Sequence, residues 1–323
     1  MIGAVITMMV AVGVLAAWKA LPGLLIGRLI TGMSVGLAAG TAITYLVELS
    51  LRADPTASPV RARTIGTSVT VGALGVGPLI AGCLAQWVAQ PLTVPYLVFI
   101  ALGVIALIGL RAAPETGTPG AGAPATGRKA AGPGRKVRLP VPAAAGTLAA
   151  FSANGLFAGL SGLFLATTLH HPSHALSGAA LFLLFACGVL SQLVTLPASR
   201  VLALGTASML AGLVLLVVSV RLATPDLAMF LIAGALIGAG SGAVFKGTTG
   251  IVLEKSPPES RVAMTSDLLI ALYVGLAVPV IGAGVALDLG ASAPSTVLGF
   301  AILVGLGGIV SGWALLGRRQ AGP

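Results

Sequence analysis

The sequence predicts an all-α membrane protein, a helix bundle with about ten transmembrane helices in groups of four and six. Three observations predict this fold: an apolar composition, ten apolar runs, and a segment that occurs twice. Of the 323 residues 57% are hydrophobic and 8% are charged, and the mean hydropathy is +1.05. Soluble domains carry roughly a quarter of charged residues, so the composition excludes that class.

The ten apolar runs are near or above the roughly 20 residues that a helix needs to cross the hydrocarbon. Because lipid offers backbone groups no hydrogen-bond partners, a helix is the expected structure of each run. The first four runs are residues 1–17, 23–48, 64–88 and 93–112, and the other six are residues 141–167, 174–196, 201–221, 226–252, 263–288 and 296–317.

One apolar segment occurs twice. Residues 25–48 match residues 231–254 at an offset of 206, and residues 63–68 match residues 261–266 at an offset of 198. Internal repeats in an apolar chain are typical of secondary transporters, whose halves move against one another around a central site. The sequence therefore predicts two related halves, the first of which lacks two helices at its start.

A polar segment separates the two halves. It carries five prolines, many glycines and a run of basic residues, a composition that does not build a packed core. We expect residues 1–112 to form a truncated N-terminal half of four helices, residues 113–140 a flexible cytoplasmic linker, and residues 141–323 a C-terminal half of six helices.

The net charge of +10 could suggest nucleic acid, but the placement of the charges indicates membrane topology instead. With Met1 inside, only Lys19 and Arg221 of the 18 basic residues lie in outer loops, two more lie within spans, and the remaining 14 are cytoplasmic. This predicts a multi-pass protein of a plasma membrane, the inner membrane of a bacterium, with both termini cytoplasmic. Lipid is an expected partner and nucleic acid is not.

Residues four apart form a stripe on one face of each repeated helix. The stripes are Arg28, Gly32, Gly36 and Gly40 in the first copy, and Gly234, Gly238, Gly242 and Lys246 in the second. Small residues at this spacing let helices approach closely in lipid, which predicts helix packing. Packing does not explain the two cations, because a charge near the bilayer centre costs on the order of 2.5–3.5 kcal/mol and usually faces a cavity or a partner. For Arg28 the alternative is a side chain that reaches the headgroups.

Lys246 and Asp267 are expected to face each other across adjacent helices as a buried pair. Lys246 precedes the end of its run, and Asp267 follows the start of the next run, so that at 1.5 Å per residue they lie roughly 12 and 9 Å below the inner surface. Such a pair is either a protonatable switch or substrate contact, or a structural ion pair.

Three patterns carry a resemblance to a known family. The pattern Leu-x-x-x-Arg-x-x-Gln-Gly-x-Gly-Ala-Ala occurs as Leu24, Arg28, Thr31, Gly32, Ser34, Val35 and Gly36, and Gly-x-x-x-Gly-Pro-x-x-Gly-Gly occurs as Ala73, Gly77, Pro78, Ala81 and Gly82. A Pro-Glu-Thr triplet stands at Pro114–Thr116. These patterns resemble the fourth helix, the fifth helix of exporters and the end of the sixth helix in the major facilitator superfamily, whose members have two six-helix halves.

The resemblance implies a proton-coupled exporter of a small molecule, a monomer that works by alternating access with no cofactor and no metal. The signature Gly-x-x-x-Asp-Arg of the family would precede Met1 and is absent, and its counterpart in the second half is reduced to Thr195 and Ser199-Arg200. The chain would then hold family helices three to twelve. A truncated, non-transporting or accessory membrane protein is therefore the alternative.

The resemblance also implies functional residues. Arg28 matches an arginine that relatives use in proton coupling, and we expect Asp267 to serve the same process. Asn154 lies mid-span in a helix with which relatives contact substrate. The expected substrate cavity consists of Asn154, Lys246, Tyr45 and Tyr273.

The sequence also suggests a cytoplasmic gate and, as a remote alternative, an enzyme. The expected cytoplasmic gate, or surface pairing, consists of Glu48, Arg63, Glu254 and Arg261. The remote alternative is an intramembrane serine protease, because residues 159–162 spell the Gly-x-Ser-Gly of rhomboid-type proteases around Ser161. That serine needs a general base, and the three histidines cluster in one outer loop at residues 170–174. We do not expect an enzyme.

Overall fold

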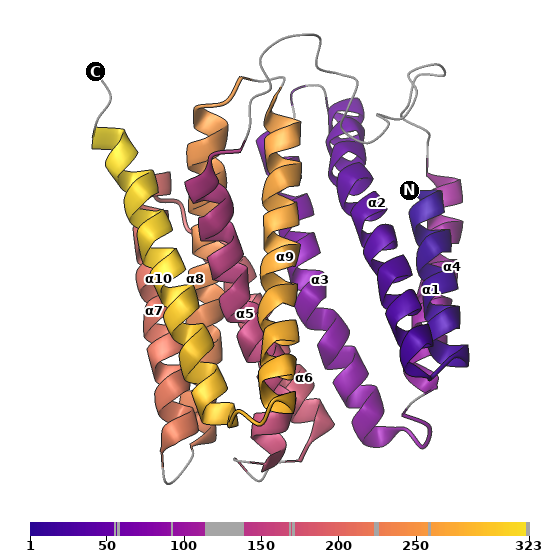
Figure 1. The fold of residues 1–323 in the computed structure, drawn as a ribbon. Coiled ribbons are helices and arrows are strands. Elements are labelled where there is room, and N and C mark those ends of the chain that lie inside the picture. The colour runs from indigo at the N-terminus through magenta and orange to yellow at the C-terminus, as the bar shows by residue number, and fades with distance from the viewer. Residues whose placement is uncertain are drawn as a thin grey trace. The chain divides into compact units, whose positions relative to one another are not determined.

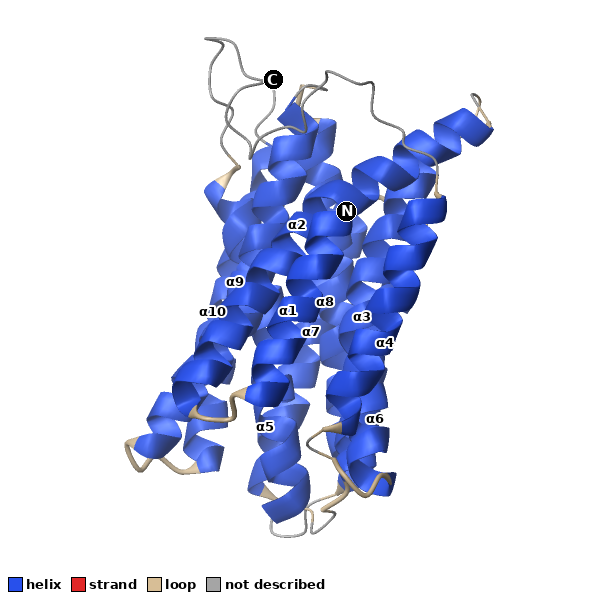
Figure 2. Ribbon diagram, turned by 90° about the vertical axis from the view of Figure 1, so that its right-hand side faces the viewer, coloured by secondary structure: helices blue, strands red, loops and turns tan. Residues whose placement is uncertain are grey.

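The computed structural model describes residues 1–54, 56, 59–91, 93–113, 139–167, 169, 172–222, 226–257 and 260–320. In these residues every regular element is a helix (Figure 2). Most of the predicted linker, residues 114–138, lies outside the described residues, as do His170 and His171.

Ten α-helices lie in the described residues (Figure 1), and each overlaps one of the ten predicted runs. They are α1 (Ile2–Ala17), α2 (Leu21–Ala53), α3 (Pro59–Trp87), α4 (Val94–Ala112), α5 (Val141–Thr167), α6 (His174–Gln192), α7 (Ala198–Arg221), α8 (Leu227–Glu254), α9 (Arg261–Asp288) and α10 (Ala293–Gln320). Seven helical segments among the described residues are long and apolar enough to span a membrane, and three apolar segments are shorter. The prediction of a multi-pass helical membrane protein is confirmed at this level.

Some helix ends differ from the predicted runs. The sixth run was expected to reach residue 196, but α6 ends at Gln192. Pro197 follows the run and directly precedes α7, and the residue before a proline is pushed out of the helical region. The residues between Gln192 and Ala198 therefore form a loop, and the backbone carbonyls at the end of α6 need other partners.

The contacts divide the chain into two compact units. The first comprises Met1–Ala73 and Ile80–Lys129, and the second comprises Leu74–Leu79 and Ala130–Pro323. In the first unit α1 packs against α2 and against α4. In the second unit α7 packs in the same way against α8 and α10, which are the helices that correspond to α2 and α4 in the repeat.

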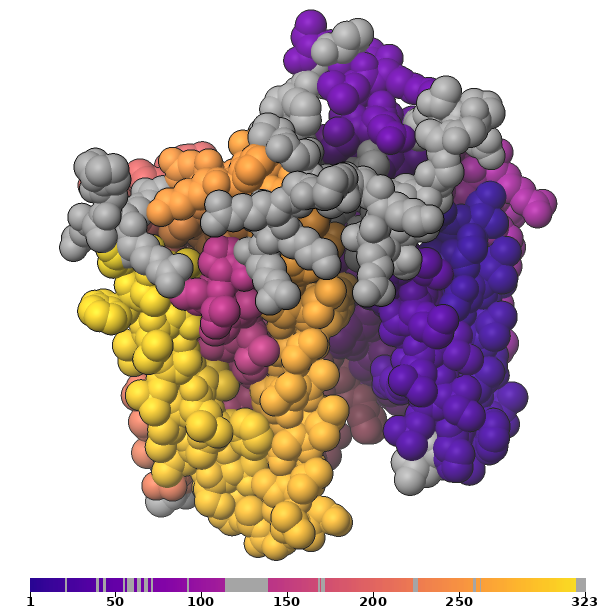
Figure 3. Space-filling view, turned by 45° about the horizontal axis from the view of Figure 1, so that its top comes forward, coloured from indigo at the N-terminus to yellow at the C-terminus, as the bar shows by residue number. Residues whose placement is uncertain are grey.

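The helix α5 is the centre of the second unit. It packs against α6, α8, α9 and α10, and 72% of its most apolar stretch is buried inside the protein, the highest share among the seven candidate spans. Figure 3 shows α9 and α10 on the surface, with one end of α5 visible between them. A helix that is apolar all round is expected in such a position.

Glycines allow the helices of the second unit to approach closely. A Cβ atom at Gly155 of α5 would overlap the carbonyl oxygen of Leu276 on α9. On α8, a Cβ atom at Gly240 would overlap the backbone nitrogen of Met209 on α7. Interfaces between helices in lipid are rich in small residues, because these let the two backbones approach closely. These contacts hold α9 against α5, and α7 against α8.

Candidate functional site

A buried polar pair joins α5 to α8 near the middle of both helices. Ser241 Oγ lies 3.0 Å from Asn154 Oδ1 and 2.9 Å from the carbonyl oxygen of Gly238 in its own helix, so its one hydroxyl proton is shared between these two acceptors. Asn154 is 2% exposed and Ser241 is 1% exposed. The sequence predicts Asn154 as a cavity residue, and the structure adds Ser241 as its partner.

The polar pair belongs to a longer line of contacts between α5 and α8. The rings of Phe151 and Phe245 lie next along the two helices, edge to face with centroids 5.7 Å apart. One turn further come Thr147 and Thr248, both fully buried, whose hydroxyls have no hydrogen-bond partner among the described residues. Unpartnered polar groups in an apolar interior are costly. The spacing of seven residues from Asn154 and from Ser241 puts the two threonines on the same faces of α5 and α8 as the polar pair.

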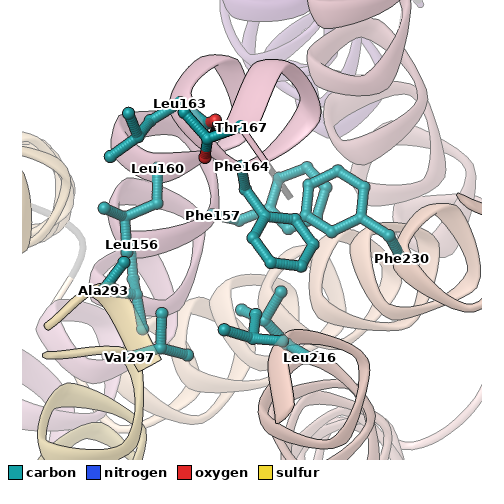
Figure 4. A pocket seen from close by; sticks show the side chains of 11 residues that line it. Leu156, Phe157, Leu160, Leu163, Phe164, Thr167, Leu216, Phe230, Ala293 and Val297 are labelled. Carbon is teal, nitrogen blue, oxygen red and sulfur yellow. Dashed lines mark hydrogen bonds between the residues drawn. The ribbon is translucent and has the colours of Figure 1, made fainter. Parts of the chain in front are cut away.

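Beyond the polar pair, α5 contributes to an aromatic cavity in the second unit (Figure 4). Phe157 of α5 stacks on Phe230 of α8 with ring centroids 4.6 Å apart, and Phe164 lies 5.3 Å from Phe230. The lining side chains also come from α7 and α10, and among them only that of Thr167 is polar. Its volume of about 20 Å³ is room for roughly one water molecule. This hollow is a packing feature, too small for a substrate.

The expected ion pair between Lys246 and Asp267 is not formed, and that prediction is wrong. Lys246 Nζ donates hydrogen bonds to the carbonyl oxygens of Gln192 and Val194, at 2.5 and 2.7 Å. Asp267 is exposed on α9. The reason is the direction of the stripe on α8, which faces α6, whereas α9 packs mainly on α5.

The other predicted cavity and coupling residues lie in both units. Arg28 is exposed on α2, and Tyr45 is half-buried on the same helix. Tyr273 is half-buried on α9 in the second unit. A common cavity for Tyr45, Tyr273 and Asn154, and the role of Arg28 in proton coupling, stay predictions.

The predicted gate residues lie at helix ends. Glu48 is exposed near the end of α2, and Glu254 is exposed as the last residue of α8. Arg261 Nε donates a hydrogen bond of 3.3 Å to the carbonyl oxygen of Ser256. The side chain of Arg63 lies outside the described part of the chain, so the pairing of these four residues stays a prediction.

The predicted packing motifs have different surroundings. A Cβ atom at Gly238 would overlap the carbonyl oxygen of Leu184, and one at Gly242 that of Gly188, both on α6. Around Gly32, Gly36 and Gly77, no other heavy atom of the described residues lies within 4 Å of such a Cβ. Pro78 lies inside α3, and its carbonyl oxygen is 2.5 Å from the position of a Cβ at Gly178.

The serine of the protease alternative is bonded to its own helix. Ser161 is 2% exposed, and its Oγ donates a hydrogen bond of 3.1 Å to the carbonyl oxygen of Ala158. His174 is the first residue of α6. Among the described residues, no three histidine, cysteine or acidic side chains lie together as a metal site would require. Whether the chain is an enzyme stays a matter of prediction.

Sequence reasoning missed Ser241, Thr147 and Thr248. One signal for Ser241 was present, because its mate at the offset of 206 is Val35. A polar residue that replaces an apolar one inside a repeated membrane helix is a departure from the repeat. Such a departure marks a position where the two copies have different neighbours or different roles.

No protein-family model and no curated protein matches this chain. The geometry and the sequence pattern therefore carry the functional argument.

Proposed function

We propose that the chain is a secondary transporter of the major facilitator type, which exports a small molecule in exchange for protons by alternating access. The observation that carries this proposal is the buried bond between Asn154 and Ser241. Polar residues inside a membrane bundle are costly and commonly mark a path for a substrate or an ion. This pair joins α8 to α5, the candidate span with the highest buried share.

The two units supply a second line of support. The corresponding helices α1 and α7 have corresponding neighbours in the repeat. In the first unit α1 packs against α2 and α4, and in the second unit α7 packs against α8 and α10. Alternating access is commonly built on such internal repeats. In this proposal Asn154 and Ser241 contact the substrate, and Arg28 and Asp267 take part in proton coupling.

The remaining parts of the proposal concern context. The protein acts as a monomer, without a cofactor, in the inner membrane of a bacterium, and both of its termini are cytoplasmic. It is not an enzyme. The alternative is a membrane protein without transport activity, in which the bond between Asn154 and Ser241 only joins two helices.

A cysteine at the polar pair tests alternating access without knowledge of the substrate. In a chain with Cys83→Ala and Cys187→Ala, the variant Ser241→Cys is treated with a membrane-impermeant, charged methanethiosulfonate reagent. Right-side-out and inverted vesicles are compared by mass spectrometry. Transport predicts labelling from both sides in turn, because residues that contact the substrate face one side of the membrane and then the other during alternating access.

Ser311→Cys is the matched control. Ser311 is 4% exposed on α10, and its Cβ lies 3.3 Å from the position of a Cβ at Gly146 of α5. It is thus a second buried serine against α5, away from α8, and we expect no labelling of it. If Ser241→Cys reacts from neither side, or from one side only, alternating access at this site is contradicted and the non-transporting alternative is favoured.

A further inference from the structure

The side-chain ammonium group of Lys246 on α8 bonds to the backbone at the end of α6. Lys246 Nζ lies 2.5 Å from the carbonyl oxygen of Gln192, the last residue of α6, and 2.7 Å from that of Val194 in the following loop. The last carbonyl groups of a helix have no partner within the helix, and this end carries partial negative charge. An ammonium group at this position satisfies both needs.

The turn after α6 leaves these two carbonyl groups for the lysine. The N–H of Leu193 bonds to the carbonyl oxygen of Leu190, and the N–H of Val194 bonds to that of Ser191. Gln192 is 5% exposed, so its surroundings offer little water as a substitute donor. In an apolar environment a carbonyl group without a donor is unfavourable.

The stripe on α8 explains why the lysine reaches this far. Gly238 and Gly242 have no side chains, and α8 therefore lies directly against the backbone of α6 at Leu184 and Gly188. Lys246 is the next residue of the same four-residue series, so it lies on the same face. At this level α6 has ended, and the long side chain extends across the end of the helix.

We propose that Lys246 is a positioning residue, which holds the end of α6 and the α6–α7 loop against α8 and does not contact the substrate. The proposal rests on contacts inside the second unit alone. It assigns a role to the cation at the end of the stripe, which glycine packing leaves unexplained. It also removes Lys246 from the predicted cavity.

Hydrogen–deuterium exchange of the full chain in lipid nanodiscs tests the proposal. Lys246→Met keeps the length of the apolar stem and removes the three donors. We expect the amides of Leu193 and Val194 to exchange about tenfold faster or more. The loss of the charge-assisted bonds from Lys246 makes local unfolding of the α6–α7 loop easier. Lys246→Arg should stay within about twofold of the unsubstituted chain, because a guanidinium can donate to the same carbonyls.

Two controls make the outcome decisive. Lys255→Met removes an exposed cation from the end of the same helix α8, and it should leave the α6–α7 loop unchanged. Amides of α5, read in the same experiment, report on folding of the whole unit. An increase confined to the end of α6 supports the proposal. No increase, an equal increase in α5, or the same increase for Lys246→Arg overturns it.

The measurement needs neither substrate nor gradient. Its result therefore stands apart from the accessibility of Ser241→Cys, which tests transport. The two experiments can therefore give opposite answers. Lys246 could hold the α6–α7 loop in a protein that does not transport, or transport could occur although Lys246 does not hold the loop.

Discussion

The two copies of the repeated helix, α2 and α8, share a stripe of glycines and differ in what covers it. On α8, Gly238 and Gly242 lie directly against the backbone of α6. Their mates on α2, Gly32 and Gly36, have no other heavy atom of the described residues within 4 Å of an added Cβ. A stripe of small residues thus permits close packing, and the presence of a neighbouring helix decides whether it occurs.

The opposite faces of α2 and α8 resemble each other more closely. Ser34 is the mate of Gly240 in the repeat. Ser34 Oγ donates a hydrogen bond of 2.8 Å to the carbonyl oxygen of Ala4 on α1, and Gly240 lies against the backbone of Met209 on α7. Both positions hold a small residue where the helix meets the one before it. The repeat is preserved where both units have the same neighbour.

Gly238 and Gly32 occupy the same position in the two copies. Alanine substitution at each is the most direct test of the difference in packing between α8 and α2. Gly238→Ala places a Cβ in the carbonyl oxygen of Leu184, and we expect a loss of about 1–3 kcal/mol of unfolding free energy or more. Gly32→Ala meets no neighbouring heavy atom within 4 Å in the part of the chain that the structure describes, and it should stabilise α2 by roughly 0.5–1 kcal/mol. Circular dichroism during SDS titration of mixed micelles measures both. Equal effects at the two positions would remove the difference between the copies.

Much of the fold could be predicted because its signals are local. Ten apolar runs give ten helices, and the offset of 206 identifies α2 and α8 as copies. The partner of Lys246 could not be predicted, because a backbone carbonyl at a helix end has no signature in the sequence. The Lys246–Asp267 pair was inferred from charge and depth alone, and neither shows which face of α8 points toward α9. Within the polar pair, the sequence predicts Asn154 as a cavity residue but does not indicate Ser241 as its partner, because the contact joins positions 87 residues apart.

A double-mutant cycle at the polar pair sharpens the comparison further. Asn154→Ala, Ser241→Ala and the double variant should give a coupling free energy of about 0.6–1.7 kcal/mol, the range for hydrogen bonds between membrane helices. The control in the first unit is Ser34→Ala, which removes the bond to the carbonyl oxygen of Ala4. Its loss of unfolding free energy should not exceed that range. Unfolding in the same micelles measures all four. A coupling near zero would show that the bond does not join α5 to α8.

The ends of α2 and α8 give the smallest expected effect. Asp54 follows α2, where a negative charge opposes the helix dipole, whereas Lys255 follows α8. Asp54 Oδ1 accepts hydrogen bonds from the Thr56 hydroxyl at 2.6 Å and the Thr56 backbone N–H at 2.8 Å. These bonds lower the pKa of the Asp54 carboxyl below its ordinary value of 3.8, because they stabilise the charged form.

The sign of the pH effect follows from that direction. Because the pKa of Asp54 is lower in the folded protein, its contribution to stability is present above pH 3.8 and is lost as the pH falls through the lower folded pKa. Thr56→Ala removes the hydroxyl donor, so the pKa of Asp54 should rise toward its ordinary value. Carboxyl carbon NMR titration of the chain measures this shift. An unchanged pKa would mean that the backbone N–H of residue 56 alone stabilises the charged carboxylate.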